Sequence, residues 1–184
     1  MQKISFLLLC FLFVFTSQKA LAADCSVNSG LDTNISADCD GFDLNSSNSN
    51  TITIDLGVTL SDGMYSNVIF LAEDLFKLDI KGVVEPTDMF AYGLYLNQRD
   101  KNNTVTLTTL DISGTLGSSG SDGRMGILMY NDANRNGNTV IGTLNNTGTI
   151  IGSTAMSLYS RSIITTINNS GSITGGSGTG IIHI

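Results

Sequence analysis

Apolar and polar positions follow a repeated pattern along most of the chain. Two segments near its end are almost duplicates, because residues 144–150 read LNNTGTI and residues 167–173 read INNSGSI. The same frame occurs upstream in residues 110–116 and 78–84, and more loosely in residues 54–60. In these copies Leu or Ile alternates with a polar residue before a glycine, so one face of an extended segment is apolar. The pattern predicts β-strands that are buried on one face.

Each copy of the frame carries a glycine at the same place. These turn glycines are Gly57, Gly82, Gly114, Gly148 and Gly171, and they follow one another at intervals of 25, 32, 34 and 23 residues. A lead-in rich in Thr and Ile precedes each copy, as in residues 104–107, and a second apolar block follows, as in residues 126–129. The pattern predicts up to three short strands per repeat, bounded by Gly, Asn and Ser. Repeats with a common core and variable loops are typical of stacked coils.

The repeat predicts an all-β fold, a parallel β-helix of about five coils over residues 51–184, stacked at about 4.8 Å per coil. An antiparallel β-sandwich is the alternative, since Asp62-Gly63, Asp122-Gly123 and Asn136-Gly137 could close hairpins. Repeated use of one motif favours the β-helix. Residues 67–80 fit both helical and strand spacing, and the repeat frame favours a strand for their second half.

Residues 1–22 have the pattern of a secretory signal peptide. Lys3 supplies a positive start, residues 4–15 are apolar apart from one serine, and Ala20 and Ala22 are small residues at a cleavage point. The apolar run is too short for a comfortable membrane span. We therefore expect export and cleavage near Ala22.

Two cysteines remain after the signal peptide and Cys10 are removed. Cys25 and Cys39 belong to an exported chain, so we expect them to form a disulfide. They lie in residues 23–50, which we expect to cap the first coil against water and edge pairing. A metal or redox role is not favoured, because no histidine or third cysteine accompanies the pair.

The charge of the chain is strongly negative. It has 9 basic and 16 acidic residues, a net charge of −7. Removing Lys3 and Lys19 with the signal peptide leaves 7 basic residues and a net charge of −9. Nucleic acid and anionic lipid are therefore not expected as partners, because both require a cationic surface. The acids are also uneven, with 12 of them in residues 24–88 and none after Asp132.

Alignment of the repeats places four polar residues at one frame position. This polar ladder consists of Asp79, Asp111, Asn145 and Asn168. Stacked carboxylates about 5 Å apart are what a pectin-degrading β-helix enzyme would use as acid and base or as Ca²⁺ ligands. Such an enzyme also needs a cationic residue beside the acids, and Lys81 is the candidate. The other interpretation is a solvated ladder of hydrogen-bonded side chains. We expect the second, with no catalytic residue, cofactor or metal.

Three further motifs resemble functional sites and depart from them. Asp38, Asp40 and Asp43 resemble a fragment of a calcium loop, but the bidentate glutamate and the full spacing are missing. Residues 175–180 begin like a calcium-binding nonapeptide, with a glycine where that motif requires aspartate. His183 is the only histidine, so imidazole catalysis is not predicted.

The signal peptide, the disulfide-closed entry segment and the reiterated NNTGTI and NNSGSI frames resemble the passenger region of a Gram-negative autotransporter, over residues 51–184. The resemblance implies a right-handed, three-sided β-helix, exported by the inner-membrane machinery and then displayed on the outer membrane or released. It also implies a C-terminal β-barrel translocator. The 184 residues contain no such barrel, and the repeat stops within a coil at residues 180–184, so a truncated C-terminus is expected. A product that is truly truncated would stay in the periplasm.

These observations favour a non-enzymatic passenger fragment. We expect adhesion or another role by contact with host or neighbouring-cell surface molecules. Residues 98–103 and 131–138 are the longest polar insertions, and binding concentrates in the loops of a solenoid. The alternatives are a secreted polysaccharide lyase or hydrolase of the pectin-degrading kind, and the remnant of a truncated gene.

Overall fold

The computed structural model describes residues 24–27, 30–45, 48–61, 67–98, 103–120, 123–132, 136–176 and 181–183. These residues form 18 β-strands and no helix. In the described part of the chain, therefore, no helix is long and apolar enough to cross a membrane. The predicted signal peptide, residues 1–22, lies outside the described residues.

The strands form three sheets of six strands each. The first sheet contains β1 (Thr33–Ile35), β4 (Asn48–Ile54), β7 (Leu75–Ile80), β10 (Val105–Ile112), β13 (Thr139–Asn146) and β16 (Ser162–Asn169). The second contains β2 (Cys39–Asp40), β5 (Thr59–Ser61), β8 (Val83–Glu85), β11 (Thr115–Gly117), β14 (Thr149–Gly152) and β17 (Ser172–Gly175). The third contains β3 (Phe42–Leu44), β6 (Asn67–Leu71), β9 (Tyr92–Asn97), β12 (Met125–Tyr130), β15 (Thr154–Leu158) and β18 (Ile181–His183).

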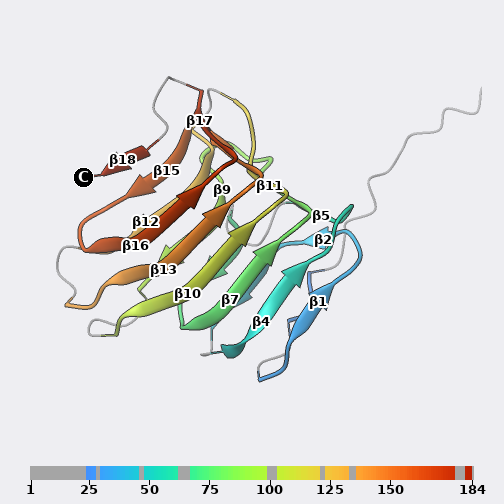
Figure 1. Ribbon diagram of the computed structural model, residues 1–184, viewed down its shortest axis with the longest axis horizontal. Helices are drawn as coiled ribbons and strands as arrows, with labels where there is room; N and C mark the ends of the chain where they lie inside the picture. Colours follow the sequence, from blue (N-terminus) through green and yellow to red (C-terminus); the bar gives the residue numbers. More distant parts are fainter. Residues whose placement is uncertain are drawn as a thin grey trace, which may run out of the picture.

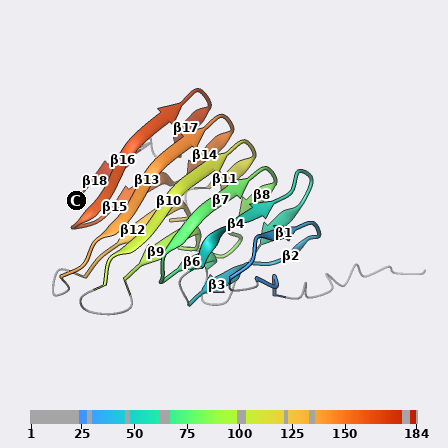
Figure 2. The ribbon, with the colours of Figure 1, turned by 60° about the horizontal axis from the view of Figure 1, so that its bottom comes forward.

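Successive strands visit the three sheets in turn. The chain runs through β1, β2 and β3, one strand in each sheet, and then repeats this order up to β16, β17 and β18. We call each set of three a strand triplet. Within each sheet the strands follow the order of the triplets, as Figures 1 and 2 show for the first sheet from β1 to β16. All strand pairs in the described residues are parallel, so the antiparallel sandwich is wrong and the fold is compatible with a parallel β-helix.

The repeat frame of the sequence corresponds to a corner between two sheets. In the fourth triplet the lead-in and the first half of the frame form one continuous strand, β10. Ser113 and Gly114 turn the chain, and the second half of the frame becomes β11 in the next sheet. The second apolar block forms β12. The strand predicted for the second half of residues 67–80 is confirmed as β7.

The first triplet lies in the segment that the sequence predicts as a cap. Residues 33–44 supply one strand to each sheet, so the described residues contain six triplets where about five coils are expected. The predicted disulfide between Cys25 and Cys39 is confirmed, with 5.3 Å between the two Cα atoms. Beside it, the Cys25 N–H donates to the Asp40 carbonyl oxygen at 2.9 Å. The disulfide indicates a non-reducing environment, as for an exported chain.

Aliphatic side chains from the three sheets form one core. At one register position of the first sheet, Ile52, Leu78, Leu110 and Leu144 are fully buried. Ile167 occupies the same position in β16 and is 43% exposed. The core is therefore closed along the inner triplets and more open at the last described one.

Candidate functional site

The polar ladder lies on the outer face of the first sheet. Asp79, Asp111, Asn145 and Asn168 are register partners in four neighbouring strands, β7, β10, β13 and β16. Thr53 of β4 and Asn34 of β1 extend the same row. Strand alternation explains the orientation, because the residues on either side of Asp111, Leu110 and Ile112, point into the core. The structure thus brings the four predicted ladder residues together.

Hydrogen bonds connect three members of the ladder in one direction. The Nδ2 atom of Asn168 donates to Oδ1 of Asn145 at 2.8 Å. The Nδ2 atom of Asn145 donates to Oδ1 of Asp111 at 2.7 Å. The amide of Asn145 therefore uses its oxygen toward β16 and its N–H toward β10. This is the bonding expected of a structural polar ladder.

Two lysines lie beside the two carboxylates. Nζ of Lys77 is 2.6 Å from Oδ2 of Asp111, and Nζ of Lys81 is 3.6 Å from Oδ2 of Asp79. Lys77 precedes Asp79 by two residues, so strand alternation places both on the same face. In the sequence, Lys81 is the cationic residue predicted to lie beside the acids, and Lys77 was not predicted. Lys77 could have been found from this alternation, because its reach to Asp111 is diagonal across neighbouring strands.

The Lys77–Asp111 ion pair sets the protonation of both groups. Burial alone would raise the pKa of Asp111, but the hydrogen bonds from Lys77 and Asn145, together with the Lys77 charge, outweigh it and lower that pKa. The hydrogen bond to Asp111 raises the pKa of Lys77 against the opposing effect of burial. At neutral pH Asp111 is therefore ionised, and each of its oxygens has a polar partner. A general acid would require a proton that this carboxyl does not hold.

The ion pair predicts a stability difference that depends on pH. The lowered pKa of Asp111 contributes stability that is present above its unfolded value of 3.8 and is lost as the pH falls through the folded pKa. The raised pKa of Lys77 contributes stability that is lost only as the pH rises beyond 10.5. Asp111→Asn should therefore lower the unfolding free energy at pH 7 by about 0.5–1 kcal/mol, because both side chains are partly solvated.

Urea unfolding of residues 23–184 at pH 7 and pH 2.5 measures this difference. The difference in unfolding free energy between the unmodified chain and Asp111→Asn should become smaller at pH 2.5, where the carboxylate is protonated. Asp88→Asn changes an exposed aspartate outside the ladder and serves as the control. An equal difference in unfolding free energy at both pH values would contradict a stabilising Lys77–Asp111 ion pair.

Four of the predicted turn glycines stack at the corner between the first and second sheets. They are Gly82, Gly114, Gly148 and Gly171, and a single residue separates each from the end of a strand of the first sheet. The Gly114 N–H donates to the Ile80 carbonyl oxygen at 3.0 Å, and the Gly82 oxygen accepts from Thr115 N–H at 2.9 Å. A Cβ atom on Gly114 would overlap the Gly82 carbonyl oxygen. The corner therefore has no room for a side chain at these positions.

Gly57, the fifth predicted turn glycine, does not lie in this stack of glycines at the corner between the first and second sheets. It has a positive φ of 85°, and a Cβ atom there would meet no atom within 4 Å. Val58 takes the corner position in the second triplet, because its oxygen accepts from Val83 N–H at 2.8 Å, as Gly82 does in the next turn. Gly57 thus serves a local turn with a left-handed backbone.

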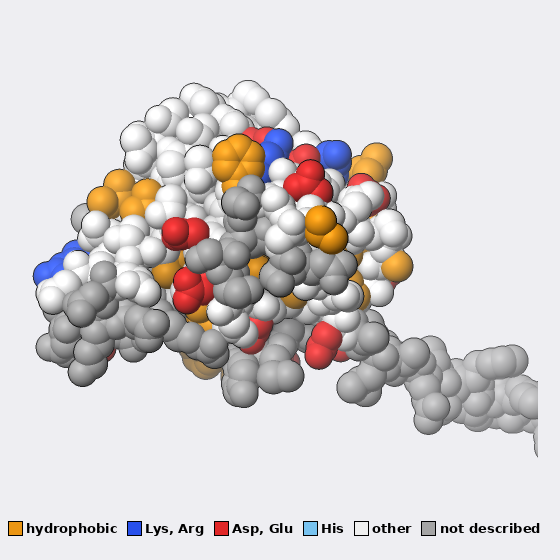
Figure 3. All heavy atoms as spheres, turned by 90° about the horizontal axis from the view of Figure 1, so that it is seen from below, with side chains coloured by type: hydrophobic (Ala, Val, Ile, Leu, Met, Phe, Trp, Pro, Cys, Tyr) orange, Lys and Arg blue, Asp and Glu red, His pale blue; other side chains and the backbone are white. Residues whose placement is uncertain are grey.

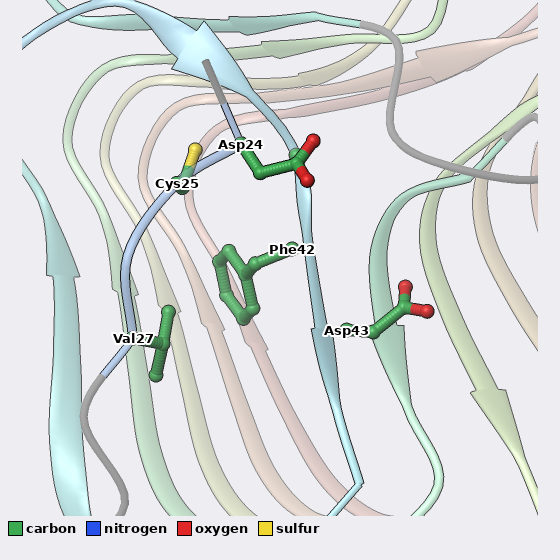
Figure 4. Close-up of a pocket in the computed structure, with 6 residues that line it drawn as sticks. Asp24, Cys25, Val27, Phe42 and Asp43 are labelled. Atoms are coloured by element: carbon green, nitrogen blue, oxygen red, sulfur yellow. The ribbon is translucent and has the colours of Figure 1, made fainter.

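A shallow hollow of about 230 Å³ lies at the N-terminal end of the stack (Figure 4). Its lining includes Asp24, Cys25, Val27, Phe42 and Asp43, and the ring of Phe42 points toward Val27 while Asp43 points away. Val27 packs against the core, so the hollow is formed where the entry segment covers the first triplet.

The calcium hypothesis for Asp38, Asp40 and Asp43 finds no support in this region. Oδ1 of Asp38 accepts from the Thr59 N–H at 2.7 Å, while Asp40 and Asp43 belong to strands of different sheets. Among the described residues, no group of three or more His, Cys, Asp or Glu side chains could hold a metal ion. Residues 177–180 of the nonapeptide-like segment lie outside the described residues.

The two predicted binding loops are described in part, since residues 99–102 and 133–135 lie outside the described residues. Their described ends are packed together, because a Cβ atom on Gly137 would overlap Nε2 of Gln98 and the Asn103 carbonyl oxygen. Gln98 and Asn131 are buried, and Nδ2 of Asn131 donates to the Gly137 carbonyl oxygen within the second loop. Comparisons with known proteins give no counterpart, as no protein-family model, curated protein or solved structure matches this chain. The ladder, the loops and the outer faces of the sheets are therefore the candidate functional surfaces of the described residues.

Proposed function

We propose that the chain is part of an exported, right-handed parallel β-helix, the passenger of an autotransporter-like protein, and that it acts by contact. The observation that supports the proposal is that one repeated sequence frame forms the same arrangement of strands in successive triplets. Each copy contributes a strand to the first sheet, a corner and a strand to the second sheet, so regular polar rows line the outer surface. Long, regular surfaces of this kind are suited to binding extended partners.

The bonding within the polar ladder supports a role without catalysis. Asp111 is held as an ionised carboxylate by Lys77 and Asn145. Asn145 and Asn168 continue the ladder as amides, which neither accept nor release a proton at neutral pH. The ladder therefore stabilises the stack of strands. The binding surfaces of the proposed passenger lie elsewhere on its outer faces and loops.

A polysaccharide lyase or hydrolase of the pectin-degrading kind is the second candidate. The placement of Lys77 and Lys81 beside Asp111 and Asp79 favours it, because enzymes of that class combine acidic and cationic side chains. The ionised state of Asp111 argues against it as a general acid, but leaves a base or a cation ligand. Cleavage of polygalacturonate by the mature chain, and its loss in Asp111→Asn, would establish the enzyme. The remnant of a truncated gene is the third candidate.

Fractionation of the cells that produce the protein tests the passenger proposal. An antibody raised against residues 24–45 should detect a band far above 19.5 kDa, the mass of this chain, in the outer membrane or the medium. Signal cleavage and a β-barrel translocator in the native product would account for that size and location. A small periplasmic band, or none, would contradict the passenger proposal and favour the gene remnant.

A further inference from the structure

Aromatic side chains are concentrated on one of the three sheets. The chain has five tyrosines, and four of them belong to the third sheet or directly follow one of its strands. Together with one phenylalanine of β6 they form what we call the aromatic face: Phe70, Tyr92, Tyr95, Tyr130 and Tyr159. The described strands of the second sheet contain no aromatic residue, and those of the first contain Phe76 alone.

The five rings form two groups of contacting rings, one of Phe70, Tyr92 and Tyr95 and one of Tyr130 and Tyr159. Phe70 and Tyr95 are register partners in β6 and β9, and their ring centroids are 5.4 Å apart. The same distance separates Tyr92 from Tyr95, and the rings of Tyr130 and Tyr159 are 5.3 Å apart. The three pairs are inclined by 41°, 53° and 63°, so their rings do not cover one another face to face.

The rings belong to the outer surface and not to the core. Each of the five side chains is half-buried, whereas Leu94 and Leu96 on either side of Tyr95 are fully buried. Aromatic pairs across strands stabilise a sheet. That role alone does not require the aromatic residues to gather on one sheet. The other two sheets are built from the same repeat, and their outer faces carry mainly polar and charged side chains.

Polar groups lie among the rings. Nδ2 of Asn97 donates to Oη of Tyr95 at 2.7 Å, so an amide and a phenol hydroxyl lie together among the rings. Burial, with a contribution from nearby Tyr159, raises the pKa of Tyr92, so this phenol stays protonated at neutral pH. Tyr130 of β12 is the register partner of Asn97, two residues beyond Tyr95 in β9, so the two groups of rings lie on neighbouring strands of the same sheet.

The net charge of the chain disfavours anionic ligands. The mature chain has a net charge of −9, and acidic side chains are spread over the view in Figure 3. Asp43 is the register partner of Phe70 at one end of the aromatic face, and Asp132 follows Tyr130 by two residues. A ligand for this surface therefore combines flat apolar patches with hydroxyl groups and carries no negative charge.

We propose that the aromatic face binds an uncharged polysaccharide. The C–H faces of its pyranose rings pack on the tyrosine and phenylalanine rings, and its hydroxyl groups exchange hydrogen bonds with the tyrosine hydroxyls. The inference rests on the proposed contact function and names the partner class and the surface for it. It differs from the pectin-degrading alternative, whose substrate is anionic and whose residues lie on the first sheet.

Binding of the mature chain to glycans tests the inference. Cellulose and an insoluble β-1,3-glucan serve as uncharged probes in sedimentation assays, and polygalacturonate serves as the anionic probe. We expect retention on at least one uncharged glycan and none on polygalacturonate. Tyr130→Leu, which keeps an apolar side chain without the ring, and Tyr95→Ala should each weaken binding at least tenfold.

Phe76→Ala provides the matched control. Phe76 is an aromatic residue of the first sheet with 52% exposure, so its removal should leave binding unchanged. Circular dichroism and thermal melting of every variant separate lost binding from lost folding, and Tyr130→Leu retains most of the buried apolar area if Tyr95→Ala unfolds. A folded chain that binds neither uncharged glycan, or a folded Tyr130→Leu that binds as the unmodified chain does, would overturn the inference.

Two outcomes separate this inference from the function on which it rests. Cells that display the chain and adhere equally well with Tyr130→Leu would keep the contact function and reject glycan binding by the aromatic face. Glycan binding that depends on Tyr130 in a chain that confers no adhesion would support the inference and reject the contact function. Binding to polygalacturonate alone, lost in Asp111→Asn, would overturn the inference in favour of the enzyme.

Discussion

Replacing Gly114 with valine is expected to abolish cooperative folding of the protein. The glycine lies at the corner between β10 and β11, where the chain passes directly over the preceding triplet. A Cβ atom on Gly114 would overlap the Gly82 carbonyl oxygen and lie 2.6 Å from that of Lys81. Both obstacles are backbone, so neither can rotate away as a flexible side chain could. The φ of Gly114 is not positive, and the effect is therefore one of space.

The expected loss in the free energy of unfolding is among the largest that a single substitution causes. Overpacking a well-packed site costs about 1–3 kcal/mol, and forcing apart two backbone segments exceeds this range. The corner is also hydrogen-bonded, since Gly114 N–H and Thr115 N–H both donate to the previous triplet. We expect a loss of more than about 4 kcal/mol, comparable to the whole stability of a marginal domain.

Thermal melting followed by circular dichroism measures the effect, and Ser113→Val provides the control. Ser113 lies in the same turn and is exposed, so valine there should change the unfolding free energy by less than about 0.5 kcal/mol. A cooperative transition of Gly114→Val at the temperature of the unmodified chain would contradict the stacked corner.

Replacing Leu110 with alanine is expected to give the second largest effect. Leu110 is fully buried between its register partners Leu78 and Leu144, which are fully buried as well. Truncation removes apolar area and leaves a cavity that the neighbouring strands, held by hydrogen bonds on both sides, cannot close. We expect a loss of about 2–5 kcal/mol in the free energy of unfolding, measured in urea.

Ile167→Ala is the matched control for Leu110→Ala. Ile167 occupies the same register column two strands further on, in β16, and is 43% exposed. Its truncation should cost about 1 kcal/mol, because part of its side chain is already in water. Equal losses for the two variants would mean that the last described triplet is as closed as the inner ones.

The repeat made much of the fold predictable from the sequence. Identical frames imply identical register, so the row of Asp79, Asp111, Asn145 and Asn168 followed from alignment of the copies. The same reasoning located the corner at Gly82, Gly114, Gly148 and Gly171. Alignment of the copies did not predict the strands of residues 33–44, because β1, β2 and β3 have two or three residues each and lack the glycine frame.

Two features of the candidate sites depend on contacts between triplets. Strand alternation places Lys77 on the face of Asp79, but its contact with Asp111, 34 residues away in the chain, forms only when the two strands are neighbours in the sheet. Gly57 occupies the frame glycine in the sequence, yet Val58 occupies the corner in space, because the second triplet has four residues between β4 and β5 where the third and fourth have two. An alignment by residue type cannot detect such a shift.

By itself, the sequence determined the β-class of this protein, its repeat, the paired cysteines and the polar row, because each of these is encoded in local alternation or in residue type. The tertiary structure alone decided the number of triplets, the ion pair that keeps Asp111 ionised, and the gathering of Phe70, Tyr95 and Tyr130 on one face. These properties arise when strands far apart in the chain are stacked in register. Neighbours within one strand do not create them.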